Sequence, residues 1–149
     1  MKFTIETALK SEGIDSKNSE IAFFGGSFTA IDREYMISLL EAAKSYLPLF
    51  KGIRISTRPD CVDNDTVTLL KSYGVTAIEL GAQSMCDDVL VANDRGHSSQ
   101  AVRDASEIIK SHGISLGLQM MTGLYKSDYN KDIYTADEFI KLMPDTVRV

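Results

Sequence analysis

Two adjacent glycines and two hydroxyl residues follow a short apolar run, residues 21–24, near the start of the chain. The stretch reads Gly25-Gly26-Ser27-Phe28-Thr29. Glycine has no Cβ, so the backbone bends sharply there and a ligand approaches it closely. The functional interpretation is a backbone edge that hydrogen-bonds the amino or carboxylate group of a ligand. The alternative is a tight turn with Ser27 or Thr29 near the N-cap of the next helix. The glycine spacing fits neither a dinucleotide-binding fingerprint nor a P-loop.

Two further apolar runs end in residues with charged or amide side chains. Arg58 stands immediately before a proline, which favours an extended backbone, and its alternative role is a surface ion pair with Asp60. Glu79 and Gln83 bracket the end of the next run. A barrel interior would bury the Glu79 carboxylate, which is costly without a partner such as Arg58 or Arg54. A helix-facing or surface glutamate is the alternative.

A loop with two cationic candidates precedes a helix that we expect to begin near Ser98. Arg95 is the better ligand candidate in this loop, because arginine binds a carboxylate through two parallel hydrogen bonds. His97 is either a general acid or base or a loop residue. Met120 and Met121 follow Gln119 at the end of another apolar run, and they either fill the core or form an apolar floor below an aromatic ligand.

The elements that position these residues alternate between strand and helix. Short apolar runs at residues 21–24, 53–56, 77–80, 114–120 and 146–149 predict buried strands. Between them lie helical periodicities that end in a lysine and a glycine, as in residues 9–14, 70–75 and 109–114, with a shorter version at 50–53. This order predicts an α/β fold with a parallel sheet. Because ligands bind at the carboxyl ends of parallel strands, we expect the polar segments to meet at one rim.

Composition excludes several classes of protein. The chain has 149 residues and a formal net charge of -5, which argues against a general electrostatic footprint for nucleic acid. It has no run long enough to span a membrane and no signal-peptide core, so we expect a cytoplasmic protein without membrane contact. Cys61 and Cys86 are far apart, which indicates neither a disulfide framework nor a metal site.

Five rim segments, in this order, resemble the radical S-adenosylmethionine superfamily, and most closely the radical SAM domain of the Elongator catalytic-subunit-like group. The oxygen-independent coproporphyrinogen oxidase branch is similar but more distant. The matching segments are residues 20–31, 52–60, 78–85, 95–97 and 117–124. The resemblance implies a partial (β/α)6 barrel without its first strand. Residues 1–149 then form one partial domain that runs from the first helix into the sixth strand.

The resemblance also implies a cofactor and its binding residues. S-adenosylmethionine would bind with its methionine amino group at Gly25 and Gly26, next to Ser27. Ser56, Gln83, Arg95 and Gln119 match positions that line the methionine and ribose part of the site, and Arg58 and Glu79 are additional candidates. In this superfamily a 4Fe-4S cluster cleaves S-adenosylmethionine reductively, and the resulting 5′-deoxyadenosyl radical abstracts a hydrogen atom. Elongator-like members carboxymethylate wobble uridine in tRNA with acetyl-CoA as the carbon source.

The sequence departs from this superfamily at the cluster. The three-cysteine motif that binds the cluster in the family does not occur here, since Cys61 and Cys86 match none of its positions. We therefore expect the chain alone to be inactive, as the core of a longer tRNA-modifying parent enzyme that holds the cluster. The alternatives are a cluster-free module that binds S-adenosylmethionine or RNA, and a radical SAM enzyme with another substrate such as a tetrapyrrole. An open sheet edge also predicts a homodimer that covers it.

Overall fold

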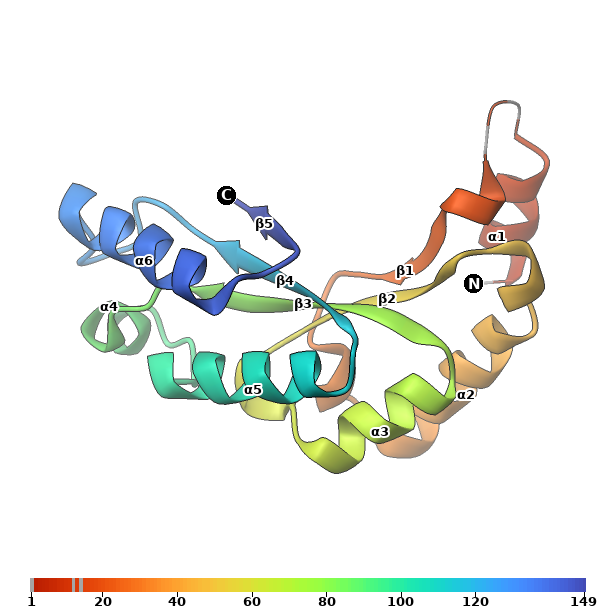
Figure 1. Ribbon diagram of the computed structural model, residues 1–149, viewed down its shortest axis with the longest axis horizontal. Coiled ribbons are helices and arrows are strands. Elements are labelled where there is room, and N and C mark those ends of the chain that lie inside the picture. Colours follow the sequence, from red (N-terminus) through yellow and green to blue (C-terminus); the bar gives the residue numbers. More distant parts are fainter. Residues whose placement is uncertain (1, 12, 14) are drawn as a thin grey trace.

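A computed structural model describes residues 2–11, 13 and 15–149 of the chain (Figure 1). Five strands are present in the described residues: β1 Glu20–Phe23, β2 Gly52–Thr57, β3 Val75–Gln83, β4 Ser115–Met120 and β5 Thr146–Arg148. The helices are α1 Lys2–Leu9, α2 Arg33–Lys44, α3 Asn64–Ser72, α4 Asp87–Ala92, α5 Ser99–Ser111 and α6 Tyr129–Leu142. No helix in these ranges combines the length and the apolar character that a membrane crossing needs.

The five strands form one sheet in the order β1-β2-β3-β4-β5, and every neighbouring pair is parallel. Each crossover between neighbouring strands contains at least one helix (Figure 1). This arrangement confirms the α/β class and the parallel sheet that the sequence predicts. All five predicted strands are present, and the strand ends therefore gather at one rim.

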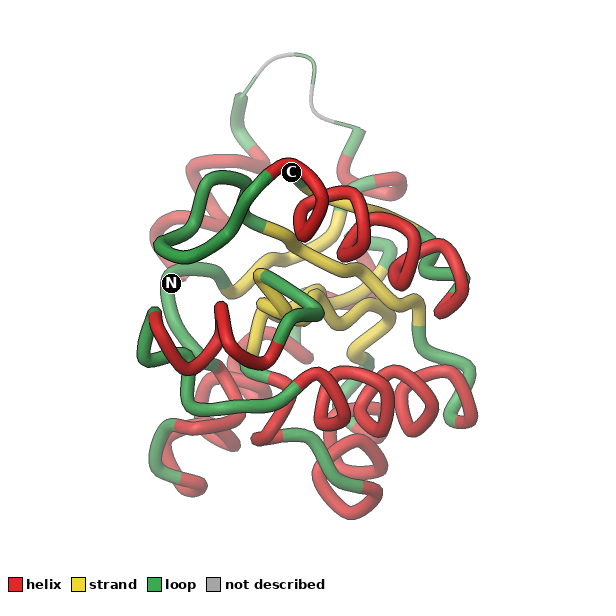
Figure 2. The backbone as a smooth tube through the Cα atoms, turned by 90° about the vertical axis from the view of Figure 1, so that its left-hand side faces the viewer, coloured by secondary structure: helices red, strands yellow, loops and turns green. Residues whose placement is uncertain are grey.

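The two faces of the sheet differ in chemistry. Alternate strand residues are apolar, fully buried and packed with the buried faces of the helices, and they include Ile53, Ile55, Ile78, Leu80, Leu116 and Leu118. The residues between them point to the other face, which we call the polar face; they include Arg54, Ser56, Glu79, Gly117, Gln119 and Arg148. Figure 2 shows the strands in the middle of the molecule with helices around them.

The sheet is strongly curved around its polar face. Phe24 directly follows β1 and Arg148 lies in β5, and these are the two edge strands. In a flat five-stranded sheet the edge strands would lie about 19 Å apart, at about 4.8 Å per strand. The guanidinium carbon of Arg148 is nevertheless only 5.2 Å from the centre of the Phe24 ring. The curvature therefore makes the polar face concave, as in a section of a barrel.

The helix-ending glycines have the predicted conformation where α3 and α5 end. Gly74 and Gly113 have φ values of +87° and +67° and follow these helices, and Lys71 and Lys110 lie in their last turns. Gly13 also has a positive φ, but α1 already ends at Leu9. Glu12 and Ile14, which belong to the same predicted repeat, lie outside the described residues.

Two local expectations need correction. Ser27 is the N-cap residue of a short 3-10 helix, Phe28–Ala30, without a side-chain hydrogen bond, whereas the N-cap of α2 is Asp32, whose carboxylate accepts a hydrogen bond from the Tyr35 amide at 2.9 Å. Gly52 is not a left-handed cap. It begins β2, and a Cβ at this position would overlap the side chain of Thr76 on β3. Close strand packing is therefore the reason for this glycine.

The two cap glycines give a matched pair of substitutions. Gly113→Ala meets open space and incurs only the left-handed backbone cost, about 1 kcal/mol of unfolding free energy. Gly74→Ala incurs the same cost and also forces its Cβ into Leu47, which adds about 1–2 kcal/mol. Urea denaturation measures both values. An equal loss in the two variants would contradict the packing of Gly74 against Leu47.

Candidate functional site

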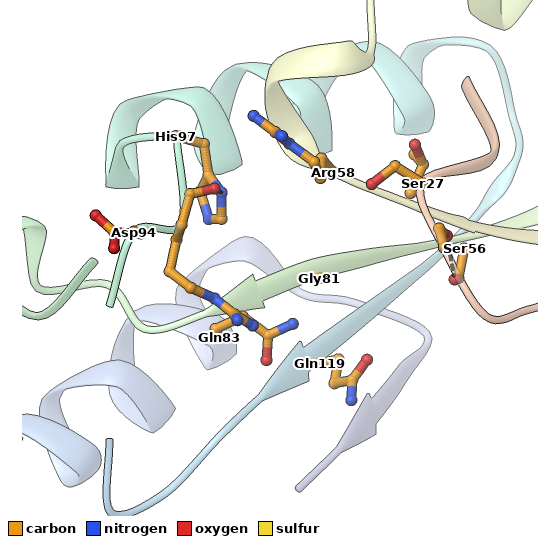
Figure 3. Close-up of a pocket in the computed structure, with 11 residues that line it drawn as sticks. Ser27, Ser56, Arg58, Gly81, Gln83, Asp94, His97 and Gln119 are labelled. Carbon is orange, nitrogen blue, oxygen red and sulfur yellow. Dashed lines mark hydrogen bonds between the residues drawn. The ribbon is translucent and has the colours of Figure 1, made fainter. Parts of the chain in front are cut away.

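Seven of the nine candidate ligand residues, all except Gly25 and Glu79, line one cavity at the carboxyl rim of the sheet. The cavity has a volume of about 270 Å³. It is lined by Gly26, Ser27, Ser56, Thr57, Arg58, Gly81, Gln83, Asp94, Arg95, His97 and Gln119, most of which Figure 3 labels. Gly25 does not line it. The sequence did not indicate Thr57, Gly81 or Asp94 as ligand residues. It left His97 as either a general acid or base or a loop residue.

Gln83 has the most unusual environment among these residues. It ends β3 with φ = +65°, and the Ser84 amide donates a hydrogen bond to the Ala82 carbonyl at 2.8 Å. These features define a tight γ-turn with a left-handed central residue, which is a strained conformation for a residue other than glycine. The Gln83 side chain is 8% exposed, and its Oε1 atom has no hydrogen-bond partner in the described structure. A strained, buried and unpartnered amide beside a cavity is typical of a ligand contact.

Gly81 provides the space that the Gln83 amide occupies. An added Cβ on Gly81 would lie 2.9 Å from the Gln83 Nε2 atom, and the rest of its surroundings are open or distant. The overlap falls on the end of a flexible side chain, so an alanine here displaces the amide without breaking the sheet. The sequence carries a signal for this role, because Gly81 is a glycine inside a strand, two residues before a glutamine on the same face.

Arg58 lies at the cavity but its guanidinium is already engaged. Its Nε and Nη2 atoms donate to the two carboxylate oxygens of Asp60 at 2.9 and 2.6 Å. Partial burial acts to raise the pKa of Asp60, but the hydrogen bonds and positive charge of Arg58 outweigh it and hold that pKa below its usual value. The ion pair that we considered as the alternative for Arg58 is therefore present, and it holds the guanidinium at the rim.

His97 connects the Arg95 loop to the end of β3. Its Nε2 lies 3.1 Å from the carbonyl oxygen of Ala82, and its Nδ1 lies 3.2 Å from that of Arg95. Only an imidazolium donates to both carbonyls, and a neutral ring donates to one. With a backbone oxygen beside each ring nitrogen, the geometry favours loop positioning over general acid or base chemistry. Arg95 itself donates to the Met121 sulfur at 3.6 Å.

The glycine turn is attached to β2 through hydroxyl groups. Ser56 donates a weak hydrogen bond of 3.4 Å to the Gly26 carbonyl, and the hydroxyls of Thr29 and Thr57 lie 2.6 Å apart. Gly25 has φ = +107°, a conformation that side chains rarely adopt. A Cβ on Gly26 would meet open space, so its lack of a side chain keeps the cavity wall open. The turn therefore presents backbone to the cavity on one side and is fixed on the other.

Glu79 is buried on the polar face, as its alternation with apolar residues predicts, but the ion pair that we considered with Arg54 or Arg58 is wrong. In the described structure these arginines pair with Glu20 and Asp60 instead. Arg148 of β5 donates to Glu79 Oε2 at 3.1 Å, while Arg54 pairs with Glu20. The sequence separation of 69 residues between Glu79 and Arg148 explains the error, because the two residues meet only when β3 and β5 flank β4, where Gly117 has no side chain to separate them.

The described residues do not fit an iron–sulfur cluster. Such clusters are held by cysteine thiolates. Cys61 and Cys86 lie on separate segments after β2 and β3, both are free, and partial burial raises the pKa of each thiol. No group of three histidine, cysteine, aspartate or glutamate side chains in the described part of the chain is placed to hold a metal ion.

A curved parallel sheet with a glycine turn and a polar cavity at its carboxyl rim defines a barrel-type α/β protein that binds a small polar ligand. The sequence matches the Radical SAM superfamily over residues 6–138. The chain therefore belongs to this superfamily.

Two curated relatives are similar to the chain over most of its length. It is 26% identical to the tRNA uridine(34) acetyltransferase of Methanocaldococcus infernus over 95% of this chain and 30% of that protein. It is 30% identical to the human Elongator complex protein 3 over 89% of this chain and 28% of that protein. The chain thus spans less than a third of the length of these relatives.

Solved structures agree with the fold. The archaeal Methanocaldococcus infernus Elp3 with an N-terminal deletion superposes with a TM-score of 0.83 and 26% identity, over 98% of this chain and 39% of that chain. Coproporphyrinogen III oxidase (HemN) from Escherichia coli gives a TM-score of 0.72 at 18% identity, over 87% of this chain and 31% of that one. The second likeness, at this low identity, shows the shared fold alone.

Replacing Gln83 by glycine tests whether the backbone at this position is strained. Gln83→Gly relieves the left-handed backbone and removes the unpartnered buried oxygen, so the free energy of unfolding rises by about 1 kcal/mol. Gln119→Gly makes the same replacement at a pocket residue inside β4, where glycine costs about 0.5–1 kcal/mol. Denaturant titration of both variants tests this. A loss of stability in Gln83→Gly equal to that in Gln119→Gly would contradict strain at Gln83.

Proposed function

We propose that the rim cavity binds S-adenosylmethionine and that the chain is the core of a radical SAM enzyme that modifies uridine in tRNA. The observation that carries the proposal is the Gln83 amide, which is strained, buried and unpartnered beside the cavity of a chain in this superfamily. A buried polar atom without a partner is rare in native proteins, and a bound ligand accounts for it.

The residues of the cavity suit the polar parts of this cofactor. Gln83 Oε1 would accept a hydrogen bond from a ribose hydroxyl or the methionine amino group, and Gln119 would bind from the neighbouring strand. The backbone of Gly26 would bind the amino group, next to Ser27 and Ser56, while Gly25, which does not line the cavity, would bend the turn. The Arg95 guanidinium would pair with the methionine carboxylate. Arg58 would contribute positive charge at the rim while it remains bound to Asp60.

The cleavage of the cofactor lies outside what these residues support. When bound, S-adenosylmethionine supplies the 5′-deoxyadenosyl group that superfamily members use for radical chemistry. The described residues orient the cofactor and enclose its polar end, but they offer no cysteine set for a cluster. Further partners are part of the same proposal. tRNA follows from the name of the archaeal relative, and acetyl-CoA would be the carbon source. A second copy of the chain would cover the open edge of the sheet at β1 or β5.

A cluster-free module that binds S-adenosylmethionine is the second candidate. The mismatch between a well-formed rim cavity and the missing cluster ligands favours it. Both candidates predict cofactor contacts at Gln83, but they differ in affinity. In the family the cluster binds the amino and carboxylate groups, so a cluster-dependent core binds weakly alone, whereas a module binds tightly without it.

Isothermal titration calorimetry of the chain with S-adenosylmethionine tests the site. Gly81→Ala displaces the Gln83 amide, so we expect the dissociation constant to rise about tenfold, the effect of one hydrogen bond. Gly113 lies just before β4, at the amino ends of the strands and away from the cavity. Gly113→Ala is therefore the matched control and should bind as the wild type does. Equal affinities in all three proteins would contradict the contact with Gln83. Absence of binding in the wild type would contradict the cluster-free module and favour the cluster-dependent core.

A further inference from the structure

Among the described residues, three glutamates pair with arginines, and they differ in one respect. Glu20 has both carboxylate oxygens partnered, one by Arg54 at 2.8 Å and the other by the Thr76 hydroxyl at 2.8 Å. The Glu138 oxygens are likewise partnered, by Arg103 and by Lys141.

Glu79 is the exception. Its side chain is more deeply buried than either of the others, yet only Oε2 is bonded, to Arg148, and Oε1 has no partner among the described residues. A buried carboxylate oxygen without a donor is costly, because burial removes its hydration and nothing replaces it. The chain therefore keeps an acceptor in the middle of its polar face.

Glu79 lines a second cavity, whose lining includes strand neighbours of residues that line the rim cavity. This cavity has a volume of about 390 Å³ and is lined by Phe24, Arg54, Glu79, Leu118, Thr146, Val147 and Arg148. Gly81 of the rim cavity is two residues beyond Glu79 on the same strand face, and Gln119 of that cavity pairs with Arg148. The second cavity thus lies beside the proposed cofactor site, on the same polar face of the sheet.

The lining of this cavity combines three functions. The free Glu79 oxygen accepts a hydrogen bond, and the exposed Arg148 guanidinium has further N–H groups to donate. The Arg148 guanidinium carbon lies 5.2 Å from the centre of the Phe24 ring, which is itself half exposed, and both side chains line the cavity. Arginine planes and aromatic rings are the surfaces on which unstacked nucleobases stack. A hydrogen-bond acceptor beside such surfaces suits a planar heterocycle that carries an N–H group.

We propose that Glu79, Arg148 and Phe24 form a subsite for a nucleobase whose pairing edge carries an N–H group, and that Glu79 Oε1 accepts this hydrogen. The inference rests on the proposed function, because the tRNA-modifying relatives give the reason to consider a base. It adds the residues that would hold the base and the atom that would recognise it. Arg148 donates to the adjacent carbonyl oxygen of the base, and Phe24 supports the ring.

Two nucleosides that differ only at this hydrogen test the subsite. Uridine has an N3–H group and 3-methyluridine does not. Titration of the chain with each, followed by NMR chemical shifts, should give an affinity about tenfold higher for uridine, the effect of one hydrogen bond to a charged acceptor. Equal affinities, or no binding of uridine at millimolar concentration, would overturn the proposal.

Variants of the three residues assign the effect. Glu79→Met removes the acceptor at nearly constant length and should abolish the preference for uridine, while the fold persists because the remaining Arg148 side chain is 54% exposed and stays hydrated without its partner. Glu138→Met, a paired glutamate on α6, is the matched control and should keep the preference. Phe24→Leu should weaken both nucleosides by a similar factor. A preference that survives in Glu79→Met would overturn the role of Glu79.

The nucleoside titration and the cofactor calorimetry fail independently. Binding of S-adenosylmethionine without a preference for uridine would overturn the subsite and leave the proposed cofactor site intact. A Glu79-dependent preference for uridine, together with equal cofactor affinities in the wild type and Gly81→Ala, would overturn the cofactor site and leave the subsite.

Discussion

The parallel register of the sheet is the constraint on which the other features of this protein depend. It aligns Ser56 with Glu79 and Glu79 with Gly117, so that the residues of one parity on neighbouring strands share a face. The other parity is apolar and fully buried under the helices, which fixes the register because a slip by one residue would expose it. The polar face is therefore a direct consequence of hydrophobic packing on the opposite side.

Unfavourable local energetics concentrate on that polar face. The two buried side-chain oxygens without a partner in the described structure belong to Glu79 and Gln83, and both residues are on β3. The left-handed turn at Gln83 is in the same strand. The apolar face of the same strand, with Ile78 and Leu80 fully buried on either side of Glu79, offsets the cost of the unpartnered oxygens and of the strained turn. A protein without a ligand at this face would have little reason to retain them.

The sequence was sufficient to predict the features that local chemistry determines. Apolar runs and helix-ending glycines predicted all five strands and the caps at Gly74 and Gly113, and the strand-end rule predicted that Ser56, Gln83 and Gln119 line one cavity. Features that depend on which strands are neighbours were not predictable. The partner of Glu79 is 69 residues away on the far edge strand. The role of Gly52 depends on Thr76 of the neighbouring strand, which no periodicity indicates.

The three glutamines of the chain allow the central claim, a cofactor bound at the rim cavity, to be tested in one NMR experiment. Gln83 and Gln119 line the cavity, whereas Gln100 lies on α5 and donates to Asp104 at 2.8 Å. Addition of S-adenosylmethionine should shift the side-chain amide signals of Gln83 and Gln119 and leave that of Gln100 unchanged. Binding that moves none of the three signals, or moves that of Gln100 alone, would contradict the account.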